Sequence, residues 1–126
     1  MRQIAVLIAL ALFSPIAASP QTQAPALPLG QGRPQTPGIT RTTLKDDAKA
    51  TVTRVQFKPG ASEPPHTHAT DVILVTVTAG TVDLGIADNK ITSVKPGDVQ
   101  FVPRDTTHYV INTGKQDFEL IAIALK

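Results

Sequence analysis

Short segments rich in β-branched residues, separated by tight-turn signals, follow one another from residue 39 to residue 126. Pro-Gly pairs at 59–60 and 96–97 mark turns, because proline fixes φ and glycine accepts a positive φ. No segment of this region shows the apolar period of a helix. Many short, regularly spaced strands are typical of a sandwich or barrel, so the pattern predicts an all-β domain. We expect strands at 50–57, 71–78, 81–86, 91–94, 98–102, 109–112 and 118–125.

Two details of this pattern carry further expectations. Asp88 and Asn89 suit a two-residue hairpin turn, since both residue types tolerate left-handed φ. The strand expected at 118–125 is nearly continuous in apolar residues, which favours a sheet edge that another surface covers. A domain this small buries only about 60–65% of its unfolded surface, so a metal or a partner subunit would add stability. We therefore expect a homodimer.

The first 38 residues have a different character. Residues 1–2 are Met and Arg, an apolar run follows from 4 to 13, and small residues occupy 17–19. This order predicts a signal peptide over residues 1–19, because the apolar run is shorter than the roughly 20 residues that span a bilayer. Residues 20–38 contain five prolines and predict a disordered linker. The expected product is an exported protein, periplasmic or secreted, with a folded domain over 39–126 and no membrane contact after signal removal.

Composition excludes several functions. The absence of cysteine excludes disulfides, thiolate chemistry and zinc fingers. The formal net charge is only +2, and the basic residues form no stripe. With four Phe, one Tyr and no Trp, the chain also lacks the aromatic residues that stack on bases. Nucleic acid is therefore not an expected partner.

The sequence contains only three histidines, and their spacing predicts a metal site. His66 and His68 are two residues apart, so in an extended segment both side chains point to the same side. His108 comes from a distant strand and completes a set of three. Imidazole suits Fe, Mn, Zn, Ni or Cu, and three protein ligands leave positions open, as in catalytic sites. The expected cofactor is one divalent transition metal.

These residues resemble the first sequence motif of the cupin superfamily. That motif runs Gly, five residues, His-x-His, three or four residues, Glu, six residues, Gly. Here Gly60 is followed by five residues, then by His66 and His68, and Gly80 closes the segment.

The second cupin motif runs Gly, five residues, Pro-x-Gly, two residues, His, three residues, Asn. The chain has Gly97, then Pro103–Asp105, then His108 and Asn112 at these spacings. The resemblance implies a single-domain cupin-type β-barrel, also called a double-stranded β-helix or jelly roll. It also implies metal ligation by His66, His68 and His108. Tyr109 is expected to pack on the opposite face of its strand, and Asn112 to cap a turn.

Two positions depart from the cupin pattern. Asp105 replaces a glycine, and the turn can persist because Asp tolerates positive φ. Counting back from Gly80, the position of the glutamate ligand falls on Ile73, which cannot bind metal. Asp71 lies two residues earlier and shares the face of Ile73 in an extended strand. Asp71 is therefore a candidate fourth ligand and catalytic group; the alternatives are an outer acceptor for a histidine and a solvated loop residue.

Three neutral imidazoles leave the full charge of a divalent metal uncompensated, which favours a small anionic molecule as the partner. Cupins with three histidines include thiol and diketone dioxygenases that use Fe(II), so the resemblance implies a mononuclear, dioxygenase-like metalloenzyme. One alternative is a binding or sensing module that holds a metal or ligand without turnover. The other is a scaffold that has lost its metal, against which the complete histidine set argues.

Overall fold

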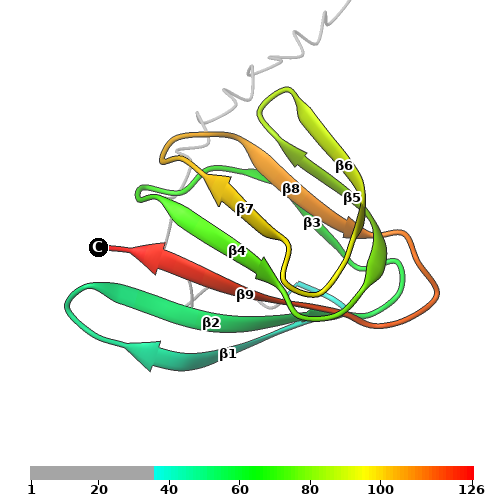
Figure 1. The fold of residues 1–126 in the computed structure, drawn as a ribbon, viewed down its shortest axis with the longest axis horizontal. Helices are drawn as coiled ribbons and strands as arrows, with labels where there is room; N and C mark the ends of the chain where they lie inside the picture. Colours follow the sequence, from blue (N-terminus) through cyan, green and yellow to red (C-terminus); the bar gives the residue numbers. More distant parts are fainter. Residues whose placement is uncertain (1–35) are drawn as a thin grey trace, which may run out of the picture.

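The computed structural model describes residues 36–126, which form nine strands and no helix. Of this part of the chain, no helix is long and apolar enough to cross a membrane. The signal peptide expected at 1–19, and the linker expected at 20–38 except for its last three residues, lie outside the described residues. The strands (Figure 1) are β1 (Ile39–Asp46), β2 (Ala50–Phe57), β3 (Ser62–His66), β4 (Val72–Thr76), β5 (Gly80–Ile86), β6 (Asn89–Val94), β7 (Val99–Val102), β8 (His108–Asn112) and β9 (Phe118–Leu125).

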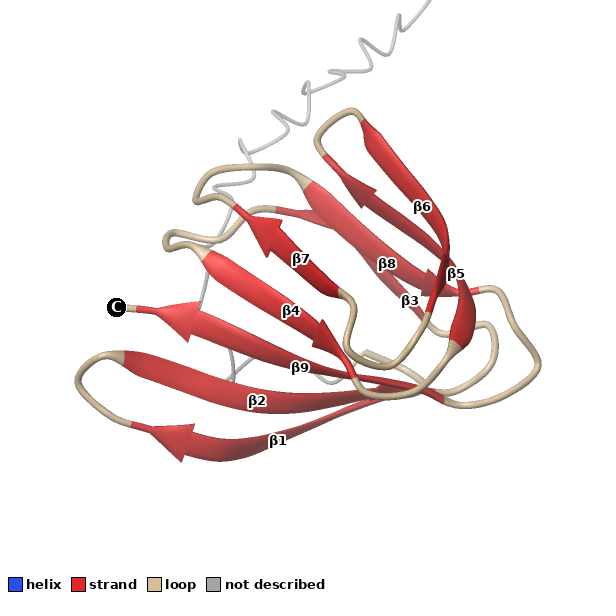
Figure 2. Ribbon diagram, in the orientation of Figure 1, coloured by secondary structure: helices blue, strands red, loops and turns tan. Residues whose placement is uncertain are grey.

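The strands form two antiparallel sheets that pack against each other (Figure 2). The five-stranded sheet has the order β1-β2-β9-β4-β7, and the four-stranded sheet has the order β3-β8-β5-β6. Apart from the hairpins β1–β2 and β5–β6, consecutive strands cross between the sheets, as in a jelly roll. The all-β prediction is confirmed.

The core lies between the sheets, where side chains alternate inward along each strand. Phe57 of β2 and Phe118 of β9 are opposite each other in the register, and their ring centroids are 5.7 Å apart. Both rings are almost completely buried. They join one contiguous apolar cluster, which includes Val55, Val72, Leu74, Val82, Leu84, Val102, Val110, Leu120 and Ala122.

All seven predicted strands are present, with ends that differ by at most two residues from the expected ones. The sequence did not predict β1 and β3. Most of β1 is exposed, so it lacks an apolar alternation, and β3 contains two adjacent prolines. Proline cannot donate to a strand ladder and is tolerated on edge strands, which is where β3 lies.

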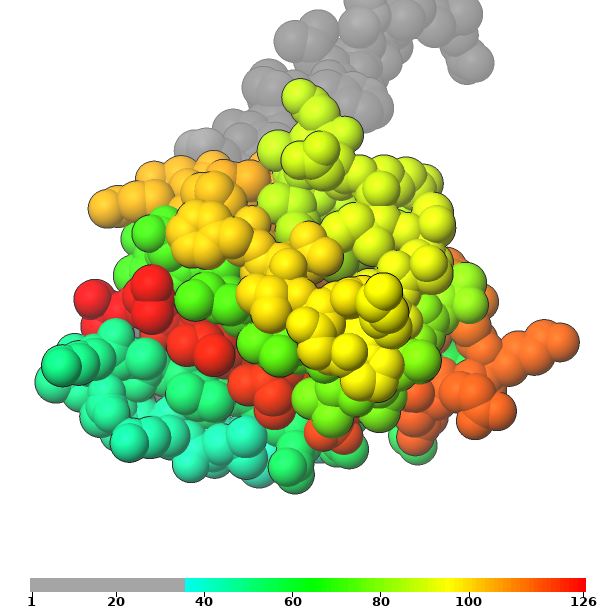
Figure 3. Space-filling view, in the orientation of Figure 1, coloured from blue at the N-terminus to red at the C-terminus, as the bar shows by residue number. Residues whose placement is uncertain are grey.

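Two expectations about turns and edges were wrong. The hairpin turn between β5 and β6 consists of Ala87 and Asp88, since Ile86 pairs with Asn89, and Ala87 takes the positive φ of 50°. The apolar strand β9 is not an edge, because it is hydrogen-bonded to β2 on one side and to β4 on the other. Its apolar sequence reflects a central place in the sheet. Figure 3 shows β2, β9, β4 and β7 next to one another across one face of the molecule.

The other predicted turns are confirmed. Gly60 and Gly97 both have positive φ, 80° and 88°, after the two prolines. Asp105 adopts a φ of 58°, so Asp occupies the left-handed position that the cupin motif gives to glycine. The loop before β8 therefore keeps its tight turn.

Candidate metal centre

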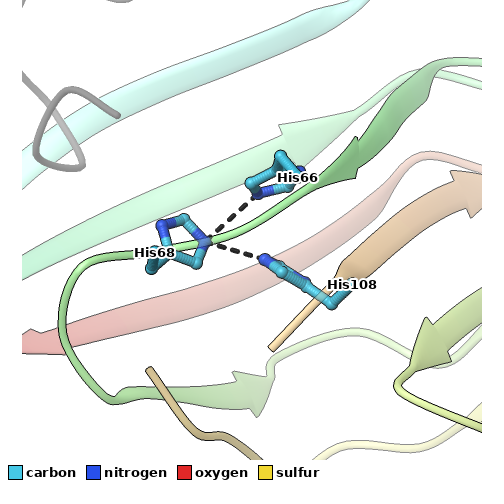
Figure 4. A group of neighbouring side chains, drawn as sticks. All are labelled: His66, His68 and His108. Atoms are coloured by element: carbon cyan, nitrogen blue, oxygen red, sulfur yellow. Dashed lines mark hydrogen bonds between the residues drawn. The ribbon is translucent and has the colours of Figure 1, made fainter. Parts of the chain in front are cut away.

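The three histidines converge inside the barrel (Figure 4). His66 ends β3 and His108 begins β8, and the two are cross-strand partners; His68 follows in the loop after β3. His68 Nε2 lies 3.1 Å from His66 Nε2 and 2.7 Å from His108 Nε2. His68 and His108 are buried, and His66 is half-buried. Distant parts of the chain therefore direct three ring nitrogens at a common point.

Hydrogen bonds between two loops hold His68 in place. The backbone N–H of Asp105 donates to the carbonyl of His68 at 2.8 Å. The neighbouring N–H of Arg104 donates to Asp71 Oδ1, also at 2.8 Å. These two hydrogen bonds, which we call the loop clamp, fasten the loop after β3 to the turn before β8. His68 and His108 therefore approach each other.

Pro64 sets the orientation of His66. His66 Nδ1 lies 2.7 Å from the Pro64 carbonyl oxygen, which can only accept, so Nδ1 donates. In the neutral ring the lone pair is then on Nε2, the atom that faces the other two histidines. Such a backbone contact is typical of the shell around metal-binding histidines.

The donor set fits a metal ion. Ligands about 2.1 Å from one ion lie about 3.0 Å apart at a right angle and about 3.4 Å apart in a tetrahedron. Two of the separations, 3.1 and 2.7 Å, are close to the first value, and the three ligand atoms all lie within 4.8 Å of one another. Lone pairs at these distances repel unless a proton or a cation lies between them. The three histidines can therefore hold one ion.

A β-bulge brings a carboxylate to the same site. Glu63 pairs with Val110, and His66 pairs with His108. Between these two pairs β3 advances by three residues and β8 by only two, so β3 contains one extra residue. The extra residue, at 64–65, resets the alternation of side chains, and Glu63 and His66 both face inward. Glu63 is 8% exposed, and its Oε1 lies 3.5 Å from His66 Nε2.

Arg41 of β1 is the ion-pair partner of Glu63. Arg41 Nη2 lies 2.8 Å from Glu63 Oε2, and both side chains are 11% exposed. Both line a pocket with an empty volume of about 320 Å³, which includes its open mouth, together with the three histidines. The remaining wall is apolar and consists of Val55, Phe57, Val72, Leu74, Val110, Leu120 and Ala122.

The sequence did not single out Glu63 or Arg41. Strict alternation from His66 puts Glu63 on the opposite face, and only the bulge reverses this. The Pro-Pro pair at 64–65 was the available signal, since prolines in a strand mark edges and bulges. Arg41 belongs to β1, a strand for which the sequence offered no apolar pattern.

The structure does not place Asp71 in the pocket. Among the described residues, Asp71 is not part of the wall, and its carboxylate accepts the N–H of Arg104 at the loop clamp. The inward residues of β4 are Val72, Leu74 and Thr76, whereas Ile73 is on the outer face with only partial burial. The expectation that the face of Ile73 leads to the metal was therefore wrong. The motif allows three residues between the second histidine and the glutamate. With that spacing from His68, the glutamate position is occupied by Val72.

Two further residues of β8, Asn112 and Tyr109, have structural roles. Asn112 is 1% exposed; its amide donates to the Phe57 and Gln116 carbonyls, and its Oδ1 accepts the Gly114 N–H. It caps the turn, as expected, and also ties that turn to the end of β2. Tyr109 packs against Gly85 on the face opposite to the histidines.

The comparison with known families agrees with this geometry. The family model for the cupin domain (Cupin_2) matches residues 53–124.

The chain belongs to the cupin domain family.

Similar proteins and structures extend this result. The cupin is 36% identical over 75 residues to germin-like protein subfamily 2 member 1 of Arabidopsis thaliana, covering 56% of this chain and 34% of that protein. It is 32% identical over 75 residues to oxalate oxidase 2 of Hordeum vulgare, covering 54% and 34%. A crystal structure of a cupin domain from Bordetella pertussis Tohama I superposes with a TM-score of 0.63 at 27% identity, covering 75% of this chain and 99% of that one. The chain spans about a third of the length of the curated relatives it matches.

Proposed function

We propose that this cupin holds one divalent transition metal through His66, His68 and His108 and acts on a small anionic molecule with dioxygenase-like chemistry. The convergence of three Nε2 atoms beside a pocket carries this proposal. The likeness to oxalate oxidase 2 supports an oxidation of a small acid, and the match covers 34% of that protein. Iron, manganese, zinc, nickel and copper all suit three imidazoles.

The charges of the pocket support an anionic partner. Glu63 and Arg41 have opposite charges and offset each other, so a divalent ion on three neutral imidazoles keeps its charge in a poorly solvated site. Arg41 Nε is buried and has no hydrogen-bond partner among the described residues, which leaves a donor for a carboxylate. The apolar wall limits water around this donor.

The bound metal would supply Lewis-acid chemistry and orient the substrate. The protein's residues have separate tasks. The Pro64 carbonyl keeps the Nε2 lone pair of His66 directed inward. The loop clamp holds His68 in position beside it. Arg41 offers a charged hydrogen bond to an anion, and Glu63 is the carboxylate of the pocket that can accept a proton.

Elemental analysis of the purified protein tests the metal site. We expect about one equivalent of transition metal, lost in His108→Ala because one of three ligands is removed. At a metal concentration 100 times Kd, binding raises the free energy of unfolding by about 2.7 kcal/mol, visible as a higher Tm. Arg54→Met, which removes a half-exposed arginine outside the pocket, serves as the control. Wild-type protein that binds none of the five metals would contradict the proposal.

A binding or sensing module is the second candidate function. The observation in its favour is that Asp71 is engaged with a loop N–H, while Glu63 is paired with Arg41. Oxygen uptake by the metal-loaded protein with carboxylates, diketones and thiols separates the two functions. Turnover that His108→Ala abolishes supports the enzyme, and saturable binding without turnover supports the module.

Export and the class of partner belong to the same proposal. The signal-peptide pattern of residues 1–19 supports a periplasmic or secreted protein. The absence of a basic stripe supports a small molecule, and not nucleic acid, as the partner.

A further inference from the structure

We infer that Glu63 is a fourth metal ligand, which supplies from β3 the carboxylate that β4 has lost. This inference rests on the proposed function, because it assumes that the three histidines bind a metal. In the cupin motif a glutamate accompanies the histidines, and here that position is Val72, which is completely buried in the pocket wall. No residue of β4 replaces it, since the other inward residues of this strand are Leu74 and Thr76.

The two oxygens of Glu63 face different partners. Oε2 lies 2.8 Å from Arg41 Nη2. Oε1 lies 3.5 Å from His66 Nε2, the same nitrogen that lies 3.1 Å from His68 Nε2. Two ligands of a tetrahedral ion are separated by about 3.4 Å, so Oε1 is spaced from His66 as a second ligand would be.

The tautomer of His66 favours a positive charge, a metal ion or a proton, between His66 and Glu63. Because Nδ1 donates to Pro64, Nε2 presents a lone pair to Oε1, and two acceptors face each other. A cation between them removes this repulsion. The ion pair with Arg41 engages the other oxygen, Oε2, and the opposite charges of Glu63 and Arg41 sum to zero. The preference for an anionic partner is therefore unchanged.

Metal titration of the purified protein tests this role without using activity. Zn²⁺ affinity is measured by competition with a chelator, and Co²⁺ binding is followed by its visible spectrum, which reports the ligand set. We expect Glu63→Gln to weaken Zn²⁺ binding by about tenfold or more and to change the Co²⁺ spectrum. Glu119→Gln, at a carboxylate that is paired with Arg54 outside the pocket, is expected to stay within about twofold of wild type.

Two further variants separate ligation from a structural ion pair. Arg41→Met removes the competing cation and leaves Glu63, so its Zn²⁺ affinity is expected to equal or exceed that of wild type. Glu63→Gln combined with Val72→Glu restores a carboxylate at the motif position and is expected to recover affinity. Circular dichroism of each variant verifies the fold.

The outcomes distinguish this inference from the proposed function. If wild type binds Zn²⁺ and His108→Ala does not, but Glu63→Gln matches wild type in affinity and Co²⁺ spectrum, Glu63 is not a ligand and the histidine site stands. Equal losses of affinity in Arg41→Met and Glu63→Gln would show that the ion pair matters and would overturn ligation. A wild-type protein that binds neither ion removes both conclusions.

Discussion

Tyr109 illustrates how closely individual residues fit in this cupin. A Cβ built on Gly85 would lie 2.2 Å from the Tyr109 ring, so only glycine fits at that place on β5. The ring hydroxyl donates to Asp83 Oδ1 at 2.9 Å. This bond stabilises the protonated hydroxyl, and together with burial it raises the pKa of Tyr109 above its ordinary value.

The ionisation of Tyr109 can be observed directly, because the chain has one tyrosine and no tryptophan. We expect the ultraviolet absorbance of phenolate to appear with a midpoint above pH ~10 in the folded protein, and Asp83→Asn to lower that midpoint. Asp117→Asn, an exposed carboxylate elsewhere, is the control. Because the folded pKa is the higher one, the contribution to stability is full below the unfolded pKa and disappears as pH rises through the folded pKa. An unchanged midpoint in Asp83→Asn would refute the assigned cause.

At the scale of elements, the pairing of β2 with β9 organises the core. The two strands pair without a register shift from Ala50–Leu125 to Phe57–Phe118. The phenylalanines close one end of this ladder, and the Phe118 ring also covers Gly80 at the start of β5. Phe118 thus connects the two sheets.

Phe118→Ala is expected to lower the free energy of unfolding by about 3–5 kcal/mol, because it leaves a cavity between the sheets. Domains of this size have total stabilities of about 5–15 kcal/mol, so the variant is expected to be marginal. Urea denaturation followed by circular dichroism measures the change. Leu44→Ala, at a side chain that is 46% exposed, is expected to change stability by no more than about 0.5 kcal/mol. Similar losses in both variants would argue against this description of the core.

At the scale of the whole molecule, the five-stranded sheet has an apolar outer face. Ile73 is in register with Phe101 on one side and Ile123 on the other, and Val75 with Val99 and Ile121, so these side chains form one surface. Val99 is 57% exposed and Phe101 is 54% exposed. This apolar surface supports the homodimer, which stays a prediction.

Light scattering coupled to gel filtration measures the oligomeric state. We expect wild type to have the mass of two copies, and Val99→Lys combined with Phe101→Lys to have the mass of one, because charges would be buried in the interface. Thr92→Lys, an exposed position of β6 in the other sheet, is expected to remain dimeric. A monomeric wild type at micromolar concentration would show that this face is not an interface between copies.

Much of the fold and part of the site could be predicted from the sequence. The turns at Gly60, Gly97 and Asp105 follow from residues whose own backbone preferences select them. The two-residue spacing of His66 and His68 and the motif around His108 predicted the cluster that the structure assembles. These features depend on few neighbours along the chain, and local conformational preference is strong enough to specify them.

Only the tertiary structure decided which carboxylate enters the pocket. Side chains along a strand point alternately to its two faces, and the one extra residue in the bulge of β3 exchanges the faces. Glu63 therefore faces inward. Asp71 instead accepts a hydrogen bond that holds a loop. The pairing of strands also decided that β9 is central and that Arg41 lies opposite Val55 in the pocket. The sequence by itself determined seven of the nine described strands, most of the turns and the set of three histidines. The strand registers, and with them the charges around the three histidines, depend on contacts between residues far apart in the chain, because no local preference selects one pairing.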